Sequence, residues 1–447
     1  MVYRYMIEPP ELFRISDDDE LTPERLAWYI TRHKNVVSGR YKKLAAAYSG
    51  DYQILHTEQK APWKPDHRLV VNFAKYITDT FEGFFMGVPV RTESTEEGVQ
   101  DTVETIETRT EQDDTNSALS HICSVYGRAY ELMYVTPAGT TETAALTPAE
   151  AFAIYTESIK PAIRYFVRTY TDTHKATRGT VSDGSTVRYF HLTTGGEVII
   201  DGEHPHGFAS VPVTEYVQNA GRTGIFEPVL SLINAYNKTI SEKANDVDYF
   251  SDAYLKILGA EIDEQTMQWM RSNRVINFRG ANASDLVVDF LAKPDGDTTQ
   301  EHLLERLERL IFTVAMVCNI SSDTFATTSG IALRYKLLPM INLARVKERK
   351  FDAAMRRRYR VMFTNPVSPL RPEAAETLRF RFVQNLPANA EDEANTAAKL
   401  TGIVSRKTQL SLLSAVDSVQ EELDRIEEEE DREAYRTDYP TDRTTED

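Results

Sequence analysis

Histidine and cysteine are the residue types in this sequence that could form a metal site or a nucleophile, and two places bring them close together. His204 and His206 flank Pro205 in the segment GEHPHGF, which we expect to be a turn. Two imidazoles could bind a divalent metal ion, but such a site needs further ligands and the sequence indicates none. His121 and Cys123 lie two positions apart on a predicted helix, where their side chains point to different faces. We therefore interpret both pairs as structural or solvent-facing residues.

Motifs of enzyme active sites are absent from the sequence. It contains no G-x-x-x-x-G-K-[ST], no G-x-G-x-x-G after a predicted strand, no H-E-x-x-H and no G-x-S-x-G. We therefore predict that the protein is not an enzyme and that it has no catalytic residue, no metal and no cofactor. The alternative that stays open is an enzyme of unrecognised type, such as a hydrolase built on residues 128–215.

Two groups of charged residues could act as binding surfaces. One interpretation of the basic group is phosphate contact. The other is a solvent-exposed face, or a face that pairs with acidic residues of a neighbouring subunit, and we favour it because the chain has an acidic excess. The acidic group, residues 427–431, is interpreted as a solvent-exposed helix end. The basic residues are Arg345, Lys347, Arg349, Lys350, Arg356, Arg357, Arg358 and Arg360.

The composition narrows the function classes further. The 447 residues include 68 acidic and 51 basic ones, a net charge of −17, which argues against gripping nucleic acid through a basic surface. Apolar residues make up 41% of the chain, which is a globular value and corresponds to about two to four domains at this length. Two cysteines are too few for a disulfide scaffold and indicate a reducing compartment. We expect neither a signal peptide nor a membrane span, because all apolar runs are too short.

Helices are predicted to make up the N-terminal part of the chain. Residues 22–50 begin with Thr22-Pro23-Glu24 and end at Gly50, which are start and stop signals of a helix. Apolar residues from Val70 to Phe85 then recur at helical spacing, and shorter helices are predicted near 99–106 and 119–127.

From about residue 128 to the segment SVPVTEYVQN the pattern is that of β-strands. Short runs rich in Tyr, Val, Ile, Phe and Thr are separated by turn signals at Asp183-Gly184 and Gly195-Gly196. The runs are AYELMYVTP, AIRYFVRTYTD, TVRYFHLTT and EVIIDGE. We predict an antiparallel sheet here.

Three long helical patterns follow the sheet. Residues 225–259 carry one narrow apolar stripe along a rod of roughly 50 Å, which suggests packing along a neighbouring helix. The second helix, which ends at residue 318, has an apolar face, and the third begins near Ile331 and contains Pro339, where we expect a kink. The apolar face of the second helix consists of Leu303, Leu307, Leu310, Ile311, Val314 and Cys318.

Shorter segments connect these helices and end the chain. Residues 260–297 form a small insertion in which RVINFRG and DLVVDFLAK are predicted as two strands. Residues 319–330 form a polar loop of small residues, which is either an ordinary connection or a mobile loop presented to a partner. A strand-like RFRFVQN and two helices follow, and the last residues are predicted to be a disordered acidic tail.

Four segments occur in the order found in one known family. They are VVNFAKYITDTFEGFFMGVPV, GIFEPVLSLINAYNKTISEKANDVDYFSDAYLKILG, SSDTFATTSGIALRYKLLPMINLARVKERKF, and NLPANAEDEANTAAKLTGIVSRKTQLSLL followed by VDSVQEELDRIEEEE. On these segments, which span roughly residues 68–430, the chain resembles the portal proteins of tailed double-stranded DNA bacteriophages of the long, non-contractile-tail type.

The resemblance implies an α+β, mostly α, portal-type fold. Its parts are long stem helices, a β-containing wing, a small α/β clip and a helical C-terminal crown. On this chain, the wing corresponds to residues 1–224 and 331–390, the stem helices to 225–259 and 298–318, the clip to 260–297, the tunnel loop to 319–330, the crown to 391–430, and the disordered acidic tail to 431–447.

The resemblance also implies a function and partners. Portal proteins form a ring, usually of twelve subunits in the virion, at one capsid vertex, and the ring is the channel for DNA packaging and ejection. The implied partners are other copies of the chain, the terminase large subunit, a head–tail adaptor, capsid and scaffolding proteins, and double-stranded DNA that passes without sequence specificity. No membrane is implied, and the host cytoplasm is the implied location during assembly. Another head–tail connector component is the alternative, although adaptors are generally much shorter than 447 residues.

The site residues implied by the resemblance fall into three groups. The tunnel loop would face DNA through Ser321, Ser322, Asp323, Thr324, Thr327, Thr328 and Ser329. The stem would contact neighbouring subunits through Phe226, Ile233, Tyr236, Ile240 and Val247. The clip would contribute Arg274, Asn277, Arg279 and Asp289.

Overall fold

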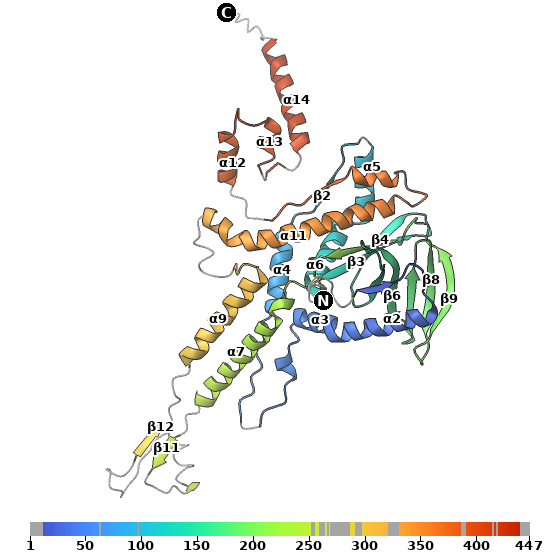
Figure 1. Ribbon diagram of the computed structural model, residues 1–447. Helices are drawn as coiled ribbons and strands as arrows, with labels where there is room; N and C mark the ends of the chain where they lie inside the picture. The colour runs from blue at the N-terminus through green and yellow to red at the C-terminus, as the bar shows by residue number, and fades with distance from the viewer. Residues whose placement is uncertain are drawn as a thin grey trace, which may run out of the picture. The chain divides into compact units, whose positions relative to one another are not determined.

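The protein is a mixed α and β structure whose chain divides into two compact units, Met1–Gln384 and Asn385–Asp447. The computed structural model describes residues 12–61, 64–96, 98–251, 255–258, 264–265, 268, 287–290, 297–320, 330–385, 390–413, 415–416 and 419–438. Figure 1 shows the course of the chain. None of the described helices combines the length and the apolar composition needed to span a bilayer.

The predicted N-terminal helix is present between the expected start and stop signals. It consists of α2 (Pro23–Val36), a π-helical turn (Val37–Tyr41) and α3 (Lys42–Ser49). The Thr22 hydroxyl caps its start by accepting a hydrogen bond from the backbone N–H of Arg25 at 3.3 Å. At its end, Gly50 adopts a φ of 88°, the left-handed conformation that favours glycine at this position.

The helices after Asn72 form the centre of the first unit. They are α4 (Phe73–Phe85), α5 (Val99–Arg109) and α6 (Gln112–Tyr126), close to where the apolar spacing predicts them. The stripe of α4 is buried against residues of α3, α9 (Asp297–Ala315) and α11 (Gly330–Met362), so the helical periodicity marks the core. The buried residues of the stripe are Phe73, Ala74, Ile77, Phe81, Phe84 and Phe85.

The β region forms two sheets where the sequence predicts one. In the larger sheet, β1 is parallel to β5 and all other neighbours are antiparallel. Its order is β1 (Phe13–Ile15), β5 (Ala151–Thr156), β6 (Ile163–Thr171), β7 (Thr177–Ser182), β8 (Thr186–Leu192) and β9 (Val198–Pro205). The smaller sheet has the order β10 (Val213–Val217), β3 (Arg128–Val135) and β4 (Thr141–Leu146).

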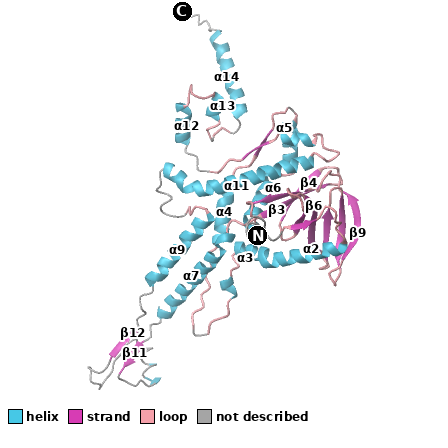
Figure 2. Cartoon of the chain, in the orientation of Figure 1, coloured by secondary structure: helices cyan, strands magenta, loops and turns pink. Residues whose placement is uncertain are grey.

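The two sheets bury apolar residues between them and under α2. Leu26 and Ile30 of α2 lie in one core cluster with Val167 and Val181 of the larger sheet. Tyr130 of the smaller sheet lies in another cluster with residues of β5 and β6. Figure 2 shows the strands of both sheets lying together on one side of this unit, apart from α7 (Leu230–Ser251) and α9.

The turns at residues 183–185 and 193–197 are confirmed, but the turn expected around Pro205 is not. β9 continues to Pro205, so His204 belongs to a strand and pairs with Val187 of β8. Strand β9 can include His204 and end at Pro205 because a proline is tolerated at the end of an edge strand.

The insertion between the long helices differs from the prediction in its strand pairing. Helix α7 ends at Ser251, and residues 255–258, expected to be helical, form strand β11 (Leu255–Leu258). Strand β12 (Val287–Phe290), which lies within the predicted DLVVDFLAK strand, pairs antiparallel with β11. The segment RVINFRG lies outside the described residues. The β-branched and long apolar residues of LKIL fit a strand as well as a helix, and pairing with β12 decides between the two.

Helix α11 begins where the sequence predicts it and runs through Pro339 without interruption of the helix. Its C-terminal part packs against the smaller sheet and against a two-stranded sheet of β2 (Arg91–Glu93) and β13 (Arg379–Arg381) through residues such as Phe351 and Tyr359. A short 3-10 helix (Pro372–Glu376) lies between α11 and β13.

The second unit contains three helices among its described residues. They are α12 (Ala390–Lys399), α13 (Arg406–Leu410) and α14 (Val419–Asp438). Helix α14 continues to Asp438, so the tail expected to be disordered from residue 431 is helical over its first residues. The Glu- and Arg-rich sequence there has high helix propensity and forms i,i+4 pairs such as Glu428–Arg432 at 3.6 Å.

A buried histidine in α2 gives the first unit a predicted pH dependence. Nε2 of His33 donates to the carbonyl oxygen of Pro148 at 2.8 Å, and burial lowers the pKa of His33 from 6.5 to about 4. Because the folded pKa lies below the unfolded one, the stabilisation is complete above pH 6.5 and is lost as the pH falls to 4. The unfolding free energy of the native chain should therefore fall between pH 6.5 and pH 4. In His33→Gln we expect this fall to be smaller by about 3 kcal/mol, measured by urea unfolding. An unchanged pH dependence would contradict this assignment.

Candidate functional site: the α7–α9 helix pair and the groove beside it

Helices α7 and α9 run antiparallel and pack against each other at the base that joins them to the rest of the first unit (Figure 1). Phe73 of α4 lies between them, with ring centroids 4.9 Å from Tyr236 and 5.7 Å from Phe312. Farther along the pair the contacts are polar: Lys243 forms an ion pair with Glu301. The base is therefore held by aromatic packing, and the outer part by charged groups at its surface.

The apolar stripe expected to face neighbouring subunits is divided between the core and the surface. Phe226 and Ile233 are 0% exposed inside the chain's own core, so neither has side-chain surface left for another copy. Tyr236 and Ile240 are half-buried, and Val247 is 61% exposed. The stripe is thus mostly an internal packing face near its start, because α4 and α11 cover it there, and it becomes a surface only toward its end.

On helix α9, too, part of the predicted apolar face is exposed. Its buried face consists of Leu304, Leu307, Ile311 and Ala315, whereas Leu303 and Val314, expected on this face, are 45% and 48% exposed. Among the described side chains of the two helices, the exposed large apolar ones are therefore Val247, Leu303 and Val314.

A polar ladder on α7 binds an extended segment that we call the strap, residues 64–71. The backbone N–H groups of Val71 and Leu69 donate to Asn237 Oδ1 and Ser241 Oγ, both at 2.9 Å. The N–H of His67 donates to Asn245 Oδ1 at 2.6 Å. All three side chains on α7 are buried.

The three hydrogen bonds form in series because the residue spacing along α7 matches the residue spacing along the extended strap. Residues four apart on a helix are separated by about 6 Å along its axis, and alternate residues of an extended chain by about 6.6 Å. The next alternate position in the strap is Pro65, which has no N–H to donate, so the series ends there. The sequence signal is the polar spacing Asn237, Ser241 and Asn245, which the search for apolar stripes does not register.

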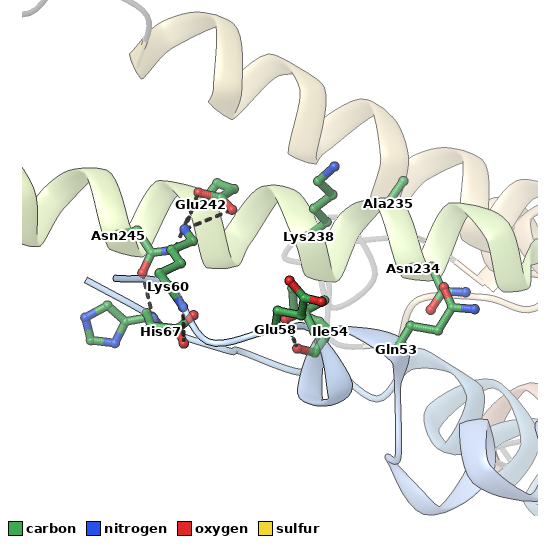
Figure 3. Close-up of a pocket in the computed structure, with 12 residues that line it drawn as sticks. Gln53, Ile54, Glu58, Lys60, His67, Asn234, Ala235, Lys238, Glu242 and Asn245 are labelled. Atoms are coloured by element: carbon green, nitrogen blue, oxygen red, sulfur yellow. Dashed lines mark hydrogen bonds and ion pairs between the residues drawn. The ribbon is translucent and has the colours of Figure 1, made fainter. Parts of the chain in front are cut away.

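A groove of about 400 Å³ lies between α7 and the chain segment that precedes and includes the strap (Figure 3). Lys60 forms an ion pair with Glu242 across the groove at 2.9 Å, and His67 pairs with Asp248. Figure 3 shows Gln53, Glu58, Asn234 and Lys238 along the remainder of the groove. These amide, amine and carboxylate groups can form hydrogen bonds, but no cysteine or serine lies beside His67 among the lining residues to act as a nucleophile.

The ladder leads to a testable expectation for Asn245→Ala. Removing the acceptor of the His67 N–H should lower the unfolding free energy by about 1 kcal/mol. It should also raise the amide hydrogen-exchange rates of His67 and Leu69 relative to the native chain. Asn234→Ala is the matched control, because Asn234 lies on the same helix and makes no hydrogen bond to the strap. Equal exchange in both variants would show that the ladder does not hold the strap.

The predicted DNA-facing loop is described only at its ends. Ser321, Ser322, Asp323, Thr324, Thr327, Thr328 and Ser329 lie outside the described residues. Before the loop, the N–H of Ile320 donates to the Tyr76 hydroxyl at 3.0 Å, and Asn319 Nδ2 donates to Glu308 at 2.9 Å.

The clip residues are placed in part. Asp289 is in β12, opposite Lys256 of β11, whereas Arg274, Asn277 and Arg279 lie outside the described residues. The structure therefore does not bring these four residues into one described site.

The basic cluster on α11 is not a single exposed face. Lys347 and Arg358 are both 0% exposed and form ion pairs at 2.7 Å with Glu82 and Glu131, respectively. Neither phosphate nor a neighbouring subunit can reach these two. The helical period explains the error: an arginine-rich stretch longer than one turn necessarily places some of its side chains on the buried face.

The histidine and cysteine pairs do not form a reactive site in the part of the chain that is described. Cys123 is fully buried, and burial raises the pKa of its thiol well above the usual range. The ring of His121 packs against Tyr48 at 4.9 Å, and His206 Nε2 lies 3.1 Å from the carbonyl oxygen of Asp183. Across the described residues, no group of three or more potential metal ligands is found.

Comparison with known proteins identifies a family. The chain matches the family described as "Phage portal protein, SPP1 Gp6-like" over residues 27–435. Among solved structures, it is similar to a chain of "Neck of empty GTA particle computed with C6 symmetry", with 13% identity, a TM-score of 0.46, and coverage of 76% of this chain and 89% of that one. It is also similar to a chain of "Virion of native gene transfer agent (GTA) particle", with 12% identity, a TM-score of 0.47, and coverage of 83% and 98%. No curated protein matches the chain.

Proposed function

The chain belongs to the SPP1 Gp6-like family of phage portal proteins, and from this membership we propose that it assembles into a ring, of twelve copies in the virion, through which DNA is packaged and ejected. The observation that carries the proposal is the family match over residues 27–435. We propose a structural and translocation role with no active site.

The antiparallel pair of α7 and α9 supports a stem in the wall of such a ring. Both helices project from the aromatic base around Phe73 and carry exposed apolar residues at Val247, Leu303 and Val314. Exposed apolar side chains on otherwise charged helices are suited to contacts with another copy. We assign the stem–stem contacts to these three residues together with Tyr236 and Ile240, in place of the buried Phe226 and Ile233.

For the other regions we propose the boundaries expected from the resemblance, except that the clip also takes in β11, which lies at residues 255–258. We propose residues 1–224 and 331–390 as the wing, 260–297 with the β11–β12 pair as the clip, and 391–430 as the crown. In this assignment the clip binds the terminase large subunit and later the head–tail adaptor. Capsid and scaffolding proteins are the proposed partners of the wing.

We propose that the loop of residues 319–330 faces DNA. The anchored residues Asn319 and Ile320 at its start support a fixed point of departure from the wall. The loop sequence contains no Lys or Arg, which are the residues that bind phosphate. Each chain of the ring also has a net charge of −17, so the ring should bind the DNA backbone only weakly. DNA would therefore remain centred and free to slide.

The test is the variant Thr327→Lys with Thr328→Lys in a reconstituted packaging motor. Added lysines should bind phosphate and reduce the DNA length packaged per unit time at low salt. The reduction should fade as salt rises, since screening acts over about 10 Å at 0.1 M. Negative-stain microscopy of the same variant should still show rings. Normal packaging at low salt by intact rings would contradict the assignment of the loop, and compact monomers of the native chain would contradict the ring.

A further inference from the structure

Helix α11 presents a basic surface that the buried ion pairs leave free. Arg345 and Arg349 are exposed, and neither forms an ion pair with another described residue. Arg349 Nε donates to the carbonyl oxygen of Arg345 at 3.2 Å, a contact within the helix that leaves the positive charges facing outward. Glu348 lies between them and is half-buried. We call Arg345 and Arg349 the basic face.

Helices α5 and α6 present an acidic surface in the same unit. Asp101 of α5, Asp114 of α6 and Glu111 between the two helices are all exposed, and none of them forms an ion pair with another described residue. We call these three residues the acidic face. Among the described residues, the acidic face has no ion-pair partner, and the basic face has only the half-buried Glu348 beside it.

The two faces point away from each other. Lys347 points from α11 toward α6, where it donates to the Ser120 carbonyl oxygen at 3.0 Å. Arg345 and Arg349 are two residues away from Lys347, which turns each of them by about 200° around the helix. The basic face is therefore on the side of α11 opposite to α6.

The same rule applies to the acidic face. Asn116 of α6 points toward α11 and accepts from Arg358 Nη2 at 2.7 Å, and Asp114 is two residues away from it. Val103 of α5 is 0% exposed in a core cluster with residues of α11, and Asp101 is two residues away from it. Both acids therefore face away from α11, about 200° around their helices from the buried contact.

We propose that the basic face of one copy binds the acidic face of the next copy, so that the two faces form a head-to-tail contact between neighbouring subunits. This inference rests on the ring proposed above and adds which surfaces meet in it. A contact between two different surfaces of the same chain repeats from copy to copy, and it closes into a ring when the rotation allows it. Opposite charges on opposite sides of one unit meet this requirement, and they also set the direction of assembly.

Charge-reversal variants test the contact. Variant A carries Arg345→Glu and Arg349→Glu, so that both of its faces are acidic. Variant B carries Asp101→Lys and Asp114→Lys, so that both of its faces are basic. Each variant alone should remain mostly unassembled at a concentration and salt at which the native chain forms rings, because like charges then meet at every contact. A chain that carries all four substitutions should assemble again.

Mixing A and B gives the sharpest outcome. Only an alternating ring places opposite charges at every contact, so mixed rings should contain A and B in equal numbers and an even total, measured by native mass spectrometry with one variant mass-tagged. Matched controls are Lys43→Glu with Lys160→Glu, and Glu197→Lys with Glu203→Lys, which make the same charge changes at other exposed positions. The control variants should assemble like the native chain.

Other outcomes overturn the proposal. If the native chain forms rings and variants A and B do so equally well, the ring stands and the charged contact is wrong. If variant A assembles normally but loses salt-dependent retention of linear duplex DNA, the basic face binds phosphate instead. If the native chain never assembles, the ring and the contact fail together. Circular dichroism checks that A and B are folded. Assembly of the chain with all four substitutions, and of the mixture of A and B, shows in addition that the substitutions do not prevent folding.

Discussion

Replacement of Glu131 with alanine is expected to lower the free energy of unfolding of the first unit by ~3–5 kcal/mol, because it leaves the Arg358 guanidinium buried without a counter-charge. Both side chains are 0% exposed, and Arg358 Nε donates to Glu131 Oε2 at 2.7 Å. The same carboxylate accepts from the Tyr216 hydroxyl at 3.0 Å, so the substitution removes a second buried hydrogen bond. Urea unfolding of the monomeric chain, followed by circular dichroism, measures the loss.

Two comparisons separate the buried charge from a general loss of packing. Glu376→Ala removes the partner of Arg360 in an exposed ion pair and should cost at most about 1 kcal/mol. Combining Glu131→Leu with Arg358→Met removes both charges, and it should recover part of the stability lost in Glu131→Ala. The recovery should be incomplete because the buried Tyr216 hydroxyl still lacks its acceptor. If Glu131→Ala were no more destabilising than Glu376→Ala, Arg358 would have found another partner and the ion pair would not be essential.

The buried ion pairs also determine how α11 is attached to the first unit. Lys347 binds Glu82 of α4 and two groups of α6, whereas Arg358 binds β3 and α6 about three turns later. Sliding or rotating α11 would leave both cations without partners, so the two contacts fix its register. A fixed α11 has a functional consequence in the proposed ring, because the helix carries the basic face on its opposite side and begins at the end of residues 319–330.

The helices could be predicted from sequence because their signals are local. The apolar spacing of α4 and the capping residue Thr22 of α2 act over three or four residues, and the structure confirms both. The ion pair of Lys347 with Glu82 joins residues 265 positions apart, and no local pattern indicates which acid a lysine will meet. The sequence therefore suggests one surface for the basic cluster on α11, although the fold buries two of its members.

In the candidate site, local sequence patterns are insufficient for prediction at two places. A stripe such as Phe226, Ile233 and Val247 indicates that one helix face is covered, but it does not say whether the chain's own core or another copy covers it. The structure decides this for Phe226 and Ile233, which are buried in the chain's own core. In the insertion, the strand that contains Asp289 was predicted, but its partner was not, because pairing with residues 255–258 depends on where α7 ends.

Replacement of Gly127 with alanine is expected to cost about 3 kcal/mol or more of unfolding free energy, through two effects that add. Gly127 ends α6 with a φ of 87°, a conformation that is unfavourable for alanine by about 1–2 kcal/mol. An added Cβ would also lie 1.9 Å from the carbonyl oxygen of Arg222, which is backbone and cannot rotate away. Overpacking of this kind costs about 1–3 kcal/mol because the surrounding backbone must shift.

Gly139→Ala isolates the two effects, since Gly139 has a φ of 81° and nothing lies within 4 Å of its added Cβ. It should therefore show the conformational cost alone, and equal losses in the two variants would mean that the backbone around Arg222 yields freely. We expect it not to yield, because the segment is bonded to the end of α6 on both sides of the contact. Gln218 N–H donates to the Gly127 carbonyl oxygen at 3.0 Å, and Ile225 N–H donates to that of Ser124 at 2.8 Å. The close approach at Gly127 thus holds the residues that lead into α7, and displacing them would move the base of the proposed stem.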